Sequence, residues 1–224
     1  MYRALEEALG YKYQNTELLR HALSHSSYAN EVYKDSMRSY ERLEFLGDSI
    51  LGFVTAEYLW RTFPNKPEGE LTRIRAELVC EKNLATVANQ IRLGDYLLLG
   101  HGEAQGGGRN RSGILCDVME ALIAAAYLDS GFEEAKGIIY RLIFPMLQKI
   151  SQNRDYKTEL QELIQQKKDQ HLTYEVLEAT GPDHCKEFLV RVSLNGQELG
   201  KGSGTSKKRA EQAAASCALE AMGK

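Results

Sequence analysis

Apolar residues recur every three or four positions through the first 150 residues of the chain. Leu5, Ala8 and Leu9 begin the pattern, and a longer series runs from Leu43 to Val54. Side chains with this spacing share one face of a helix, so these segments are predicted to be amphipathic helices. Since nothing in this region alternates between apolar and polar residues for long, we expect an all-α domain over residues 1–150.

Two polar segments interrupt these helices. FPNKPEG (63–69) contains two prolines and a glycine, and therefore predicts a loop. HGEAQGGGRNRSG (101–113) is glycine-rich and polar, which predicts a mobile connection. The residues after it, ILCDVMEALIAAAYLDSG, predict a strongly apolar helix that ends at Gly131.

A different pattern begins after residue 150. The polar residues 151–155 are expected to form a linker, and a helix is predicted from Thr158 to about Gln166. LTYEVLEA (172–179) has the composition of a strand, and KEFLVRVSL carries apolar side chains at every second position. Asn195-Gly196 then predicts a hairpin turn, because both residues readily adopt positive φ angles.

QELGKG predicts a third strand, and the chain closes with a helix. The apolar stripe of that helix is predicted to consist of Ala210, Ala213, Ala214, Cys217, Ala218 and Met222. The order of elements after the linker predicts a small α+β domain, α-β-β-β-α, over residues 156–224.

Charge and cysteine content limit the possible functions. The net charge is −3, and residues 155–224 carry 10 Lys or Arg against 11 Asp or Glu, so a nucleic-acid surface would need local clusters of cations. No run reaches the roughly 18 apolar residues of a membrane span, and we expect no membrane association. The cysteines are scattered without a CxxC pair, which favours reduced core thiols in the cytoplasm over disulfides or zinc: Cys80, Cys116, Cys185 and Cys217.

Carboxylates recur on two of the predicted helices. Glu41, Glu44 and Asp48 are spaced i, i+3 and i+7, which places them on one helical face. A solvated surface is the ordinary interpretation of such a stripe. Asp117 and Glu120, however, lie at i and i+3 inside an almost wholly apolar helix, where an unpaired acid is costly to bury. A hard, oxygen-seeking cation is the natural partner of such acids.

Ligands that are all oxygen favour Mg²⁺ or Mn²⁺ over zinc or copper. An all-carboxylate site without a protein nucleophile suits hydrolysis of a phosphodiester. A ferritin-like di-iron site is the chemical alternative, but it requires Glu-x-x-His pairs, and none of the five histidines has Glu three residues before it. His21 and His25 lie four residues apart without an HExxH motif, and are expected to be structural.

The acidic segments resemble a known family. YERLEFLGDSILG (40–52) is similar to the bacterial ribonuclease III signature, and DVMEALIAAAYLDSG (117–131) is similar to that family's second acidic segment. NKPEGELTRIRAELV (65–79) and the C-terminal module also resemble it, so the likeness covers almost the whole chain. The resemblance implies an endoribonuclease that hydrolyses double-stranded RNA, leaving 5′-phosphate ends and short 3′ overhangs. It also implies the processing of ribosomal RNA precursors and other structured transcripts.

The same resemblance implies roles for particular acids. Four carboxylates would bind Mg²⁺, for which Mn²⁺ is able to substitute: Glu44, Asp48, Asp117 and Glu120. Four would take part in catalysis, with Glu120 ranked first: Asp48, Glu120, Glu41 and Glu68. The family further implies a homodimer, in which Phe45 would help to make the dimer contact.

The C-terminal module contains a concentrated group of cations. In GSGTSKKRAEQAAA (202–215), glycines lead into a helix whose first turn carries Lys207, Lys208 and Arg209. Free backbone amides, the helix dipole and these cations together predict a phosphate-binding site. The module resembles a double-stranded RNA-binding domain, which contacts 2′-hydroxyls and phosphates over about 16 base pairs. Further contacts to the minor groove are expected from Thr158, Gln161, Glu162, Gln165 and His184.

Other ligands are not indicated by the sequence. Gly106-Gly107-Gly108 lacks the Lys-Ser/Thr of a P-loop, so we expect neither a nucleotide nor an organic cofactor. The twelve tyrosines are dispersed and form no predicted stacking platform for single strands. The alternative function is a non-catalytic protein that binds RNA duplexes on an inactive nuclease scaffold. The presence of all the expected acids favours the enzyme.

Overall fold

The computed structural model of the chain describes residues 2–147, 156–165, 170–181 and 186–222. These residues form two separate hydrophobic cores, one in each of two units. The first unit spans Met1–Gln152 and the second Asn153–Lys224. The expected linker, 151–155, lies outside the described residues. Within these residues, no helix is long and apolar enough to cross a membrane.

The first unit is helical, as its apolar spacing predicts. Its helices are α1 (Arg3–Leu9), α2 (Thr16–Ala22), α3 (Ser26–Tyr28), α4 (Glu41–Thr62), α5 (Glu68–Leu78), α6 (Glu81–Gln90), α7 (His101–Gln105), α8 (Ser112–Ser130) and α9 (Phe132–Leu142). Short turns connect them: η1 (Ala29–Tyr33), η2 (Ser36–Arg38), η3 (Leu93–Tyr96) and η4 (Gly108–Asn110). The prediction of an all-α first domain is confirmed.

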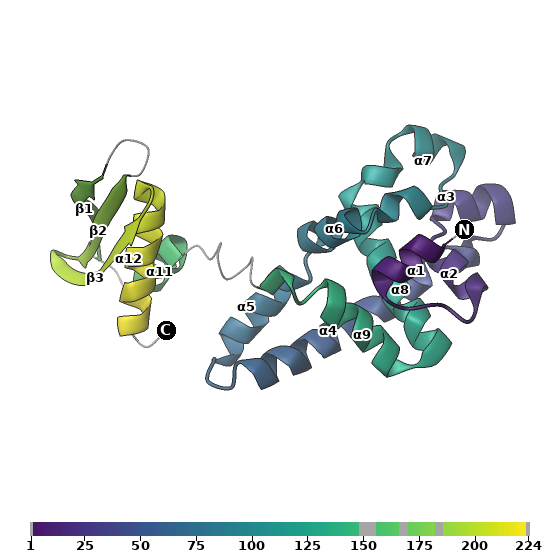
Figure 1. The fold of residues 1–224 in the computed structure, drawn as a ribbon, viewed down its shortest axis with the longest axis horizontal. Coiled ribbons are helices and arrows are strands. Elements are labelled where there is room, and N and C mark those ends of the chain that lie inside the picture. Colours follow the sequence, from purple (N-terminus) through teal and green to yellow (C-terminus); the bar gives the residue numbers. More distant parts are fainter. Residues whose placement is uncertain (1, 148–155, 166–169, 182–185, 223–224) are drawn as a thin grey trace. The chain divides into compact units, whose positions relative to one another are not determined.

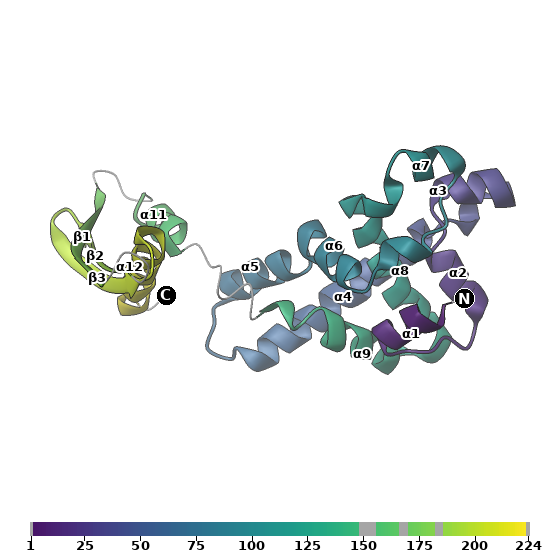
Figure 2. The ribbon, with the colours of Figure 1, turned by 45° about the horizontal axis from the view of Figure 1, so that its top comes forward.

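The central helix of this unit is α8, which lies among α2, α4, α6 and α9 in Figure 1 and Figure 2. Its large apolar side chains Leu115, Met119 and Leu122 are fully buried. The alanines at 121 and 124–126 are also fully buried, and their small side chains let the neighbouring helices approach closely. The acids of α8 are therefore carried by the most enclosed helix of the unit.

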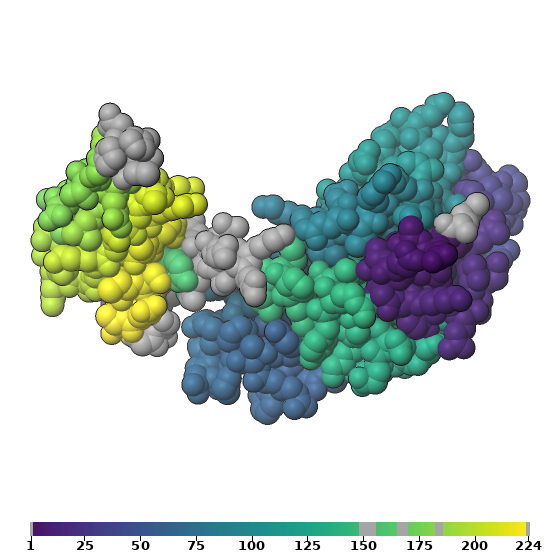
Figure 3. All heavy atoms as spheres, viewed as in Figure 1, coloured from purple at the N-terminus to yellow at the C-terminus, as the bar shows by residue number. Residues whose placement is uncertain are grey.

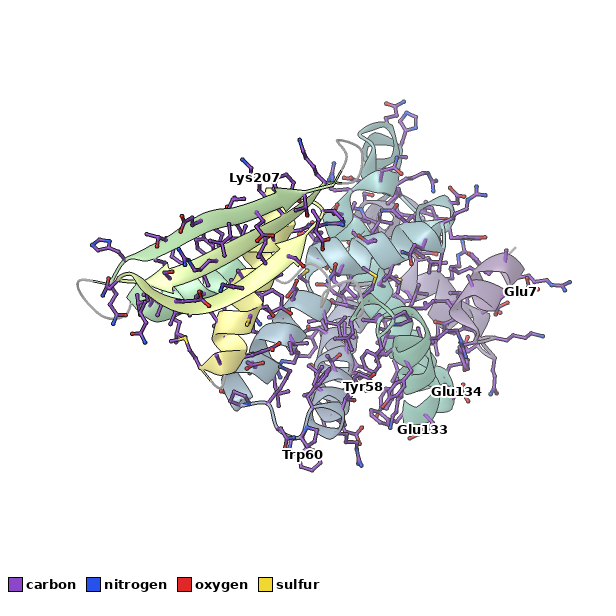
Figure 4. All side chains as sticks on the ribbon, turned by 60° about the vertical axis from the view of Figure 1, so that its left-hand side comes forward. Glu7, Tyr58, Trp60, Glu133, Glu134 and Lys207 are labelled. Carbon is purple, nitrogen blue, oxygen red and sulfur yellow. The ribbon has the colours of Figure 1, made fainter. Side chains whose placement is uncertain are left out.

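Two contacts stabilise the ends of α4 and α9. Near the end of α4, the ring of Tyr58 stacks on Phe144 with 4.0 Å between centroids, whereas Trp60 is 69% exposed and points outward (Figure 4). At the N-terminus, α1 lies against α9, as Figure 3 shows. The guanidinium of Arg141 on α9 donates a hydrogen bond to the carbonyl of Leu9, which ties the two helices together.

The segment 101–113 does not form the mobile connection that its glycines predict. It contains α7 and η4, and α8 already begins at Ser112. The guanidinium of Arg109 donates hydrogen bonds to the carbonyls of Gly94 (2.9 Å) and Leu97 (3.0 Å). An ion pair of 2.8 Å joins Arg111 to Glu103. These arginine contacts order the segment, and hydrophobic periodicity does not report such contacts.

The second unit contains α11 (Tyr156–Gln165), β1 (Leu172–Thr180), β2 (Glu187–Leu194), β3 (Gln197–Gly204) and α12 (Lys207–Ala221). The strands form an antiparallel sheet in the order β1-β2-β3. Between β2 and β3, Asn195 and Gly196 have φ angles of 50° and 86°, as the predicted hairpin turn requires. The predicted α+β fold is confirmed.

The closing helix α12 packs directly on β3. A Cβ atom added at Gly202 would lie 2.2 Å from the backbone nitrogen of Ala214, so only glycine permits this approach. The buried stripe consists of Ala210, Ala214, Ala215, Ala218 and Leu219. The expected stripe was wrong in part, because Cys217 and Met222 are exposed. The glycines of β3 lie against Ala210, Ala214 and Ala218, and Ala215 and Leu219 are buried in the same core.

The cysteines also depart in part from the expected core thiols. Cys116 is buried, Cys80 is partly buried and Cys217 is exposed, and all three are free thiols. Cys185 lies outside the described residues.

Candidate functional site

The acidic stripe of α4 begins in the first turn of the helix. Glu41 and Asp48 are exposed, and Glu44 is half-buried. Between them, Gly47 faces α8 so closely that an added Cβ atom would lie 1.9 Å from the carbonyl oxygen of Glu120. The glycine of the ERLEFLGDS segment therefore allows α4 to cross α8 at the level of its acids.

The acids of α8 lie at this crossing. Glu120 is only 9% exposed, and Asp117, one turn earlier, is half-buried. Burial, followed by the charges of Asp48, Glu44 and Asp117, raises the pKa of Glu120 to about 8. Glu120 is thus enclosed, and the carboxylates of Asp48, Glu44 and Asp117 are near enough to disfavour its charged form.

Glu44 shows the same mutual influence from the other helix. Burial raises the pKa of Glu44, and the charges of Asp117, Glu41 and Asp48 raise it further. Five of the predicted site acids are thus brought into one cluster between α4 and α8: Glu41, Glu44, Asp48, Asp117 and Glu120. We call this group the carboxylate cluster.

Tyr40, the residue just before α4, joins the two halves of the carboxylate cluster. Its hydroxyl donates a hydrogen bond of 3.1 Å to the Asp117 carboxylate, and its side chain is 4% exposed. Burial raises the pKa of Asp117, whereas the hydrogen bond from Tyr40 lowers it. The reasoning from sequence missed this residue, although it directly precedes Glu41 in the YERLEFLGDS segment.

Two further charges act on Asp117. Glu81, at the first position of α6, raises the pKa of Asp117, and His25 lowers it. The ring of His25 lies 5.8 Å from that of Tyr40 between centroids. Neither residue belongs to an acidic segment of the sequence, so spacing alone could not have found them.

The donor atoms of the carboxylate cluster suit a hard divalent cation. All are carboxylate oxygens, which Mg²⁺ and Mn²⁺ prefer. As they stand, no three His, Cys, Asp or Glu side chains among the described residues converge closely enough to hold a metal ion. The carboxylates are nevertheless near enough to raise one another's pKa. A shared ion would therefore need the carboxylate oxygens to come closer together than they are here.

Glu68 is not brought to the carboxylate cluster of its own chain. It is the first residue of α5, and its carboxylate accepts a hydrogen bond of 2.7 Å from the hydroxyl of Thr72 in the same helix. The helix α4 rises about 27 Å from Glu44 to Thr62, at about 1.5 Å per residue. Glu68 follows that far end after a short loop.

Phe45 lies on the same turn of α4 as Glu44 but points to the surface. It is 78% exposed, and Phe53, eight residues later on the helix, is 60% exposed. The ring of Phe53 packs at its edge against Phe132, with 5.9 Å between centroids. Phe45 is thus accessible to another protein, as the predicted dimer contact requires.

The predicted cations of the second unit all lie in the first turn of α12. Lys207, Lys208 and Arg209 are exposed, and Lys207 lies where the helix begins beside the sheet (Figure 4). Ser206 precedes them, and its hydroxyl accepts a hydrogen bond from the backbone amide of Arg209. This cap fixes the turn that carries the cations.

The predicted polar face belongs to α11, a helix that packs against α12. Thr158, Gln161 and Glu162 are exposed, while Leu160 and Ile164 are buried against the sheet and α12. Lys157 donates a hydrogen bond of 2.7 Å to Glu211, which joins the beginning of α11 to α12. Gln165 ends α11, but its side chain is not described, and His184 lies outside the described residues.

Comparison with known proteins gives consistent matches over both units. A family model described as Ribonuclease-III-like matches residues 15–147, and one described as a double-stranded RNA binding motif matches residues 156–222. The Ribonuclease 3 of Listeria innocua is 43% identical over 223 residues, covering 99% of this chain and 97% of that protein. That of Oceanobacillus iheyensis is 45% identical over 222 residues, covering 98% and 97%. A solved nuclease domain of ribonuclease III from Campylobacter jejuni matches with a TM-score of 0.60 and 42% identity, covering 65% of this chain and 97% of that domain.

Proposed function

The chain belongs to the ribonuclease III family, and from that premise we propose that it is an endoribonuclease that hydrolyses double-stranded RNA with Mg²⁺. The observation that carries the proposal is the carboxylate cluster. A carboxyl group as enclosed as Glu120 is costly to keep charged, and three neighbouring acids add to that cost. Such an arrangement is typical of a site that holds a cation.

The residues of the carboxylate cluster would bind the cation and take part in catalysis. Glu44, Asp48, Asp117 and Glu120 would hold Mg²⁺, with Mn²⁺ able to substitute. Bound there, the cation supplies positive charge for the phosphate and lowers the pKa of a water molecule. Glu120, the most buried acid of the cluster, is the residue we rank first for catalysis, because a cation bound there would offset the negative charge that burial disfavours.

Tyr40 has a positioning role in this proposal. Its hydroxyl holds one oxygen of Asp117 by a hydrogen bond, which leaves the other oxygen for a ligand. Glu41 lies at the open end of the cluster, where it would line the path of the RNA. Glu68 begins α5, beyond the end of α4 that is far from the carboxylate cluster of its own chain. It would take part in catalysis only if it were brought closer to a cluster than it is in this structure.

The second unit would hold the duplex. Exposed cations at the capped start of α12 suit backbone phosphates. The polar residues of α11 suit the 2′-hydroxyls of the shallow minor groove. The match of residues 156–222 to a double-stranded RNA binding motif supports this assignment.

We also propose that the protein works as a homodimer. The solved Campylobacter jejuni domain is described as having a region involved in dimer formation. Among the described residues, Phe45 is the most exposed large apolar side chain, and a second copy would cover it. Two carboxylate clusters in one dimer would cut both strands and leave 5′ phosphates with short 3′ overhangs. Substitution of Phe45 by Ser should shift the sedimentation coefficient towards that of a monomer.

Ribosomal RNA precursors and other structured transcripts are the proposed substrates. They contain the extended duplexes that a module of this kind binds, since it reads the A-form shape more than the base sequence. The described cysteines are free, and we place the activity in the cytoplasm, where thiols stay reduced.

The experiment is to incubate the protein with a long RNA duplex, with and without Mg²⁺, and to map the ends of any products. Single-stranded RNA and a DNA duplex of the same sequence serve as controls. We expect cutting of the RNA duplex alone, and only with the cation. Binding of the duplex without cleavage under Mg²⁺ or Mn²⁺ would instead support the non-catalytic binding protein.

A further inference from the structure

A small pocket with two arginines lies at the surface of the first unit, just before α4 begins. It has a volume of about 150 Å³, and its lining includes Glu17, Arg20, His21, Tyr33 and Arg38. These residues come from α2, η1 and η2, which all lie within residues 16–38. Neither the family signature nor the acidic segments include them.

The two arginines converge on one aromatic ring. The guanidinium carbon of Arg38 lies 4.4 Å from the ring centroid of Tyr33, and that of Arg20 lies 5.6 Å from the same centroid. The hydroxyl of Tyr28 accepts a hydrogen bond from Arg20 at 3.5 Å. Attraction to the ring thus holds two positive charges close to one another, where an anion would relieve their repulsion.

The acid in the pocket does not neutralise both arginines. Glu17 lies 3.9 Å from Arg38, and its side chain is 68% exposed, so water weakens this pair. His21 is engaged elsewhere, since its Nε2 lies 2.9 Å from the carbonyl oxygen of Ser39. The pocket therefore carries a net positive charge.

The geometry favours a phosphate over a base. A guanidinium presents its N–H groups as a fork that matches phosphate oxygens. Arg38 already covers a face of the Tyr33 ring, so a base could not stack on that face. The two arginines therefore offer a ligand hydrogen-bond donors with positive charge.

The pocket is close to the carboxylate cluster along the chain. Only Ser39 and Tyr40 separate Arg38 from Glu41. The Cα atoms of Arg38 and Glu41 can therefore be at most about 11 Å apart. A phosphate at the arginines would be a few nucleotides from one at the carboxylates.

We propose that Arg20 and Arg38 form a phosphate-binding site beside the carboxylate cluster. The phosphate belongs to the RNA backbone or to a free nucleotide, and the backbone source rests on the proposed function. As a backbone contact, the site holds the strand on the side of the cluster where α4 begins. It thereby adds a contact in the first unit to those made by α12.

The test compares two double variants of the full chain. Arg20→Gln with Arg38→Gln removes the proposed site, and Arg3→Gln with Arg61→Gln is the matched control. Each control arginine is exposed and pairs with an acid at 2.9 Å. Fluorescence anisotropy of a labelled RNA duplex, without divalent ions and over a series of KCl concentrations, gives the affinity and its salt dependence.

For a backbone phosphate we expect the site variant to bind about tenfold more weakly at 0.1 M salt, with a log–log salt slope smaller by about one to two. The control variant should keep the wild-type slope. If the slope is unchanged but calorimetry shows that wild type binds uridine 5′-monophosphate and the site variant does not, the source is a free nucleotide. If the site variant keeps both the wild-type salt slope and the wild-type behaviour towards uridine 5′-monophosphate, the site does not exist.

A third variant separates charge from folding. Arg20→Lys with Arg38→Lys keeps both charges, and should keep the salt slope while lowering affinity. A slope as small as that of the glutamine variant would mean that the pocket had been disrupted, and would overturn the proposal. A cleavage assay with Mg²⁺ on the same wild-type preparation distinguishes failure of the proposed nuclease activity from failure of the proposed phosphate site. Wild type that fails to cut contradicts the nuclease assignment, whereas wild type that cuts beside a variant with unchanged binding contradicts only the phosphate site.

Discussion

The two units of this chain place their functional charges in opposite ways. In the first unit, Glu120 is 9% exposed and lies against the crossing of α4 and α8, so the proposed catalytic acid is also part of the core. In the second unit, the cations at the beginning of α12 are exposed, while the core consists of uncharged side chains such as Leu160, Val190 and Ala214. Function and packing coincide in one unit and are separate in the other.

This difference has an energetic consequence. Burial of like charges costs stability, which the first unit can recover by binding a cation. Exposed lysines cost little, and so they can be changed without affecting the fold. Substitutions in the first unit should therefore change cleavage and stability together, whereas those in α12 should change binding alone.

The largest effect is expected from Glu120→Gln. The change removes a buried negative charge and a proposed ligand while keeping the shape of the side chain. Cleavage should fall by at least about 1,000-fold, and the free energy of unfolding without divalent ions should rise by on the order of 1 kcal/mol. Single-turnover cleavage and urea unfolding measure the two quantities, and duplex affinity should stay within about twofold. A large loss of affinity would mean that Glu120 is structural.

A smaller effect on cleavage is expected from Gly47→Ala. The new methyl group would meet the Glu120 carbonyl, so α4 and α8 must separate and the carboxylates move apart. We expect about 100-fold slower cleavage and a loss of about 1–3 kcal/mol in unfolding free energy.

Gly52 on the same helix provides the control for this change. A Cβ added at Gly52 meets nothing within 4 Å. Gly52→Ala should therefore stabilise the helix by up to about 1 kcal/mol and leave cleavage unchanged. Equal losses in the two variants would show that the crossing at Gly47 is not required.

In the second unit, Lys207→Ala with Lys208→Ala should act on binding alone. Because each lysine neutralises about one phosphate, we expect about tenfold weaker duplex binding and a log–log salt slope smaller by about two. Unfolding free energy should change by less than about 0.5 kcal/mol. An unchanged salt slope would exclude these lysines from the interface, and a large loss of stability would contradict the separation of function from packing.

The smallest effect is expected from Asp129→Asn, at the other end of α8 from Asp117. Burial raises the pKa of Asp129, but hydrogen bonds from the Tyr11 hydroxyl and the amides of Gln14 and Asn15 lower it below its ordinary value. Its stabilisation is thus present above the unfolded pKa and is lost as the pH falls through the lower folded pKa. Asp129→Asn should cost about 1 kcal/mol at pH 7, and less near pH 3, with normal cleavage.

The control for that variant is Asp95→Asn, which removes an exposed acid paired with Arg92. It should change the unfolding free energy by less than about 0.5 kcal/mol at either pH. If the difference in unfolding free energy between Asp129→Asn and wild type is as large near pH 3 as at pH 7, the negative charge of Asp129 is not what stabilises its contacts with Tyr11, Gln14 and Asn15.

Much of this arrangement could be predicted from the sequence, because it depends on local spacing. The i, i+3 and i+7 positions of Glu41, Glu44 and Asp48 require only that α4 be a helix, and the turn at Asn195-Gly196 requires only local backbone freedom. The strands and helices of the second unit also follow from periodicity of two and 3.6 residues.

The remaining features depend on contacts between distant residues, which local spacing does not record. The hydrogen bond from Tyr40 to Asp117 spans 77 positions, and the approach of Gly47 to Glu120 spans nearly as many. The order in segment 101–113 depends on arginine contacts to loop carbonyls. The two arginines at Tyr33 lie on α2 and η2 and belong to no recognised motif, so only the structure brings them together.

The most direct test separates duplex binding, assigned to the second unit, from cleavage, assigned to the first, by adding Mg²⁺ to a preformed complex. Protein and a labelled RNA duplex are mixed without divalent ions, the complex is verified by gel mobility, and cleavage is then followed after the cation is added. We expect a stable complex before addition, and cutting of the bound duplex afterwards. A duplex that binds only once Mg²⁺ is present, or a preformed complex that stays intact after its addition, would contradict the account.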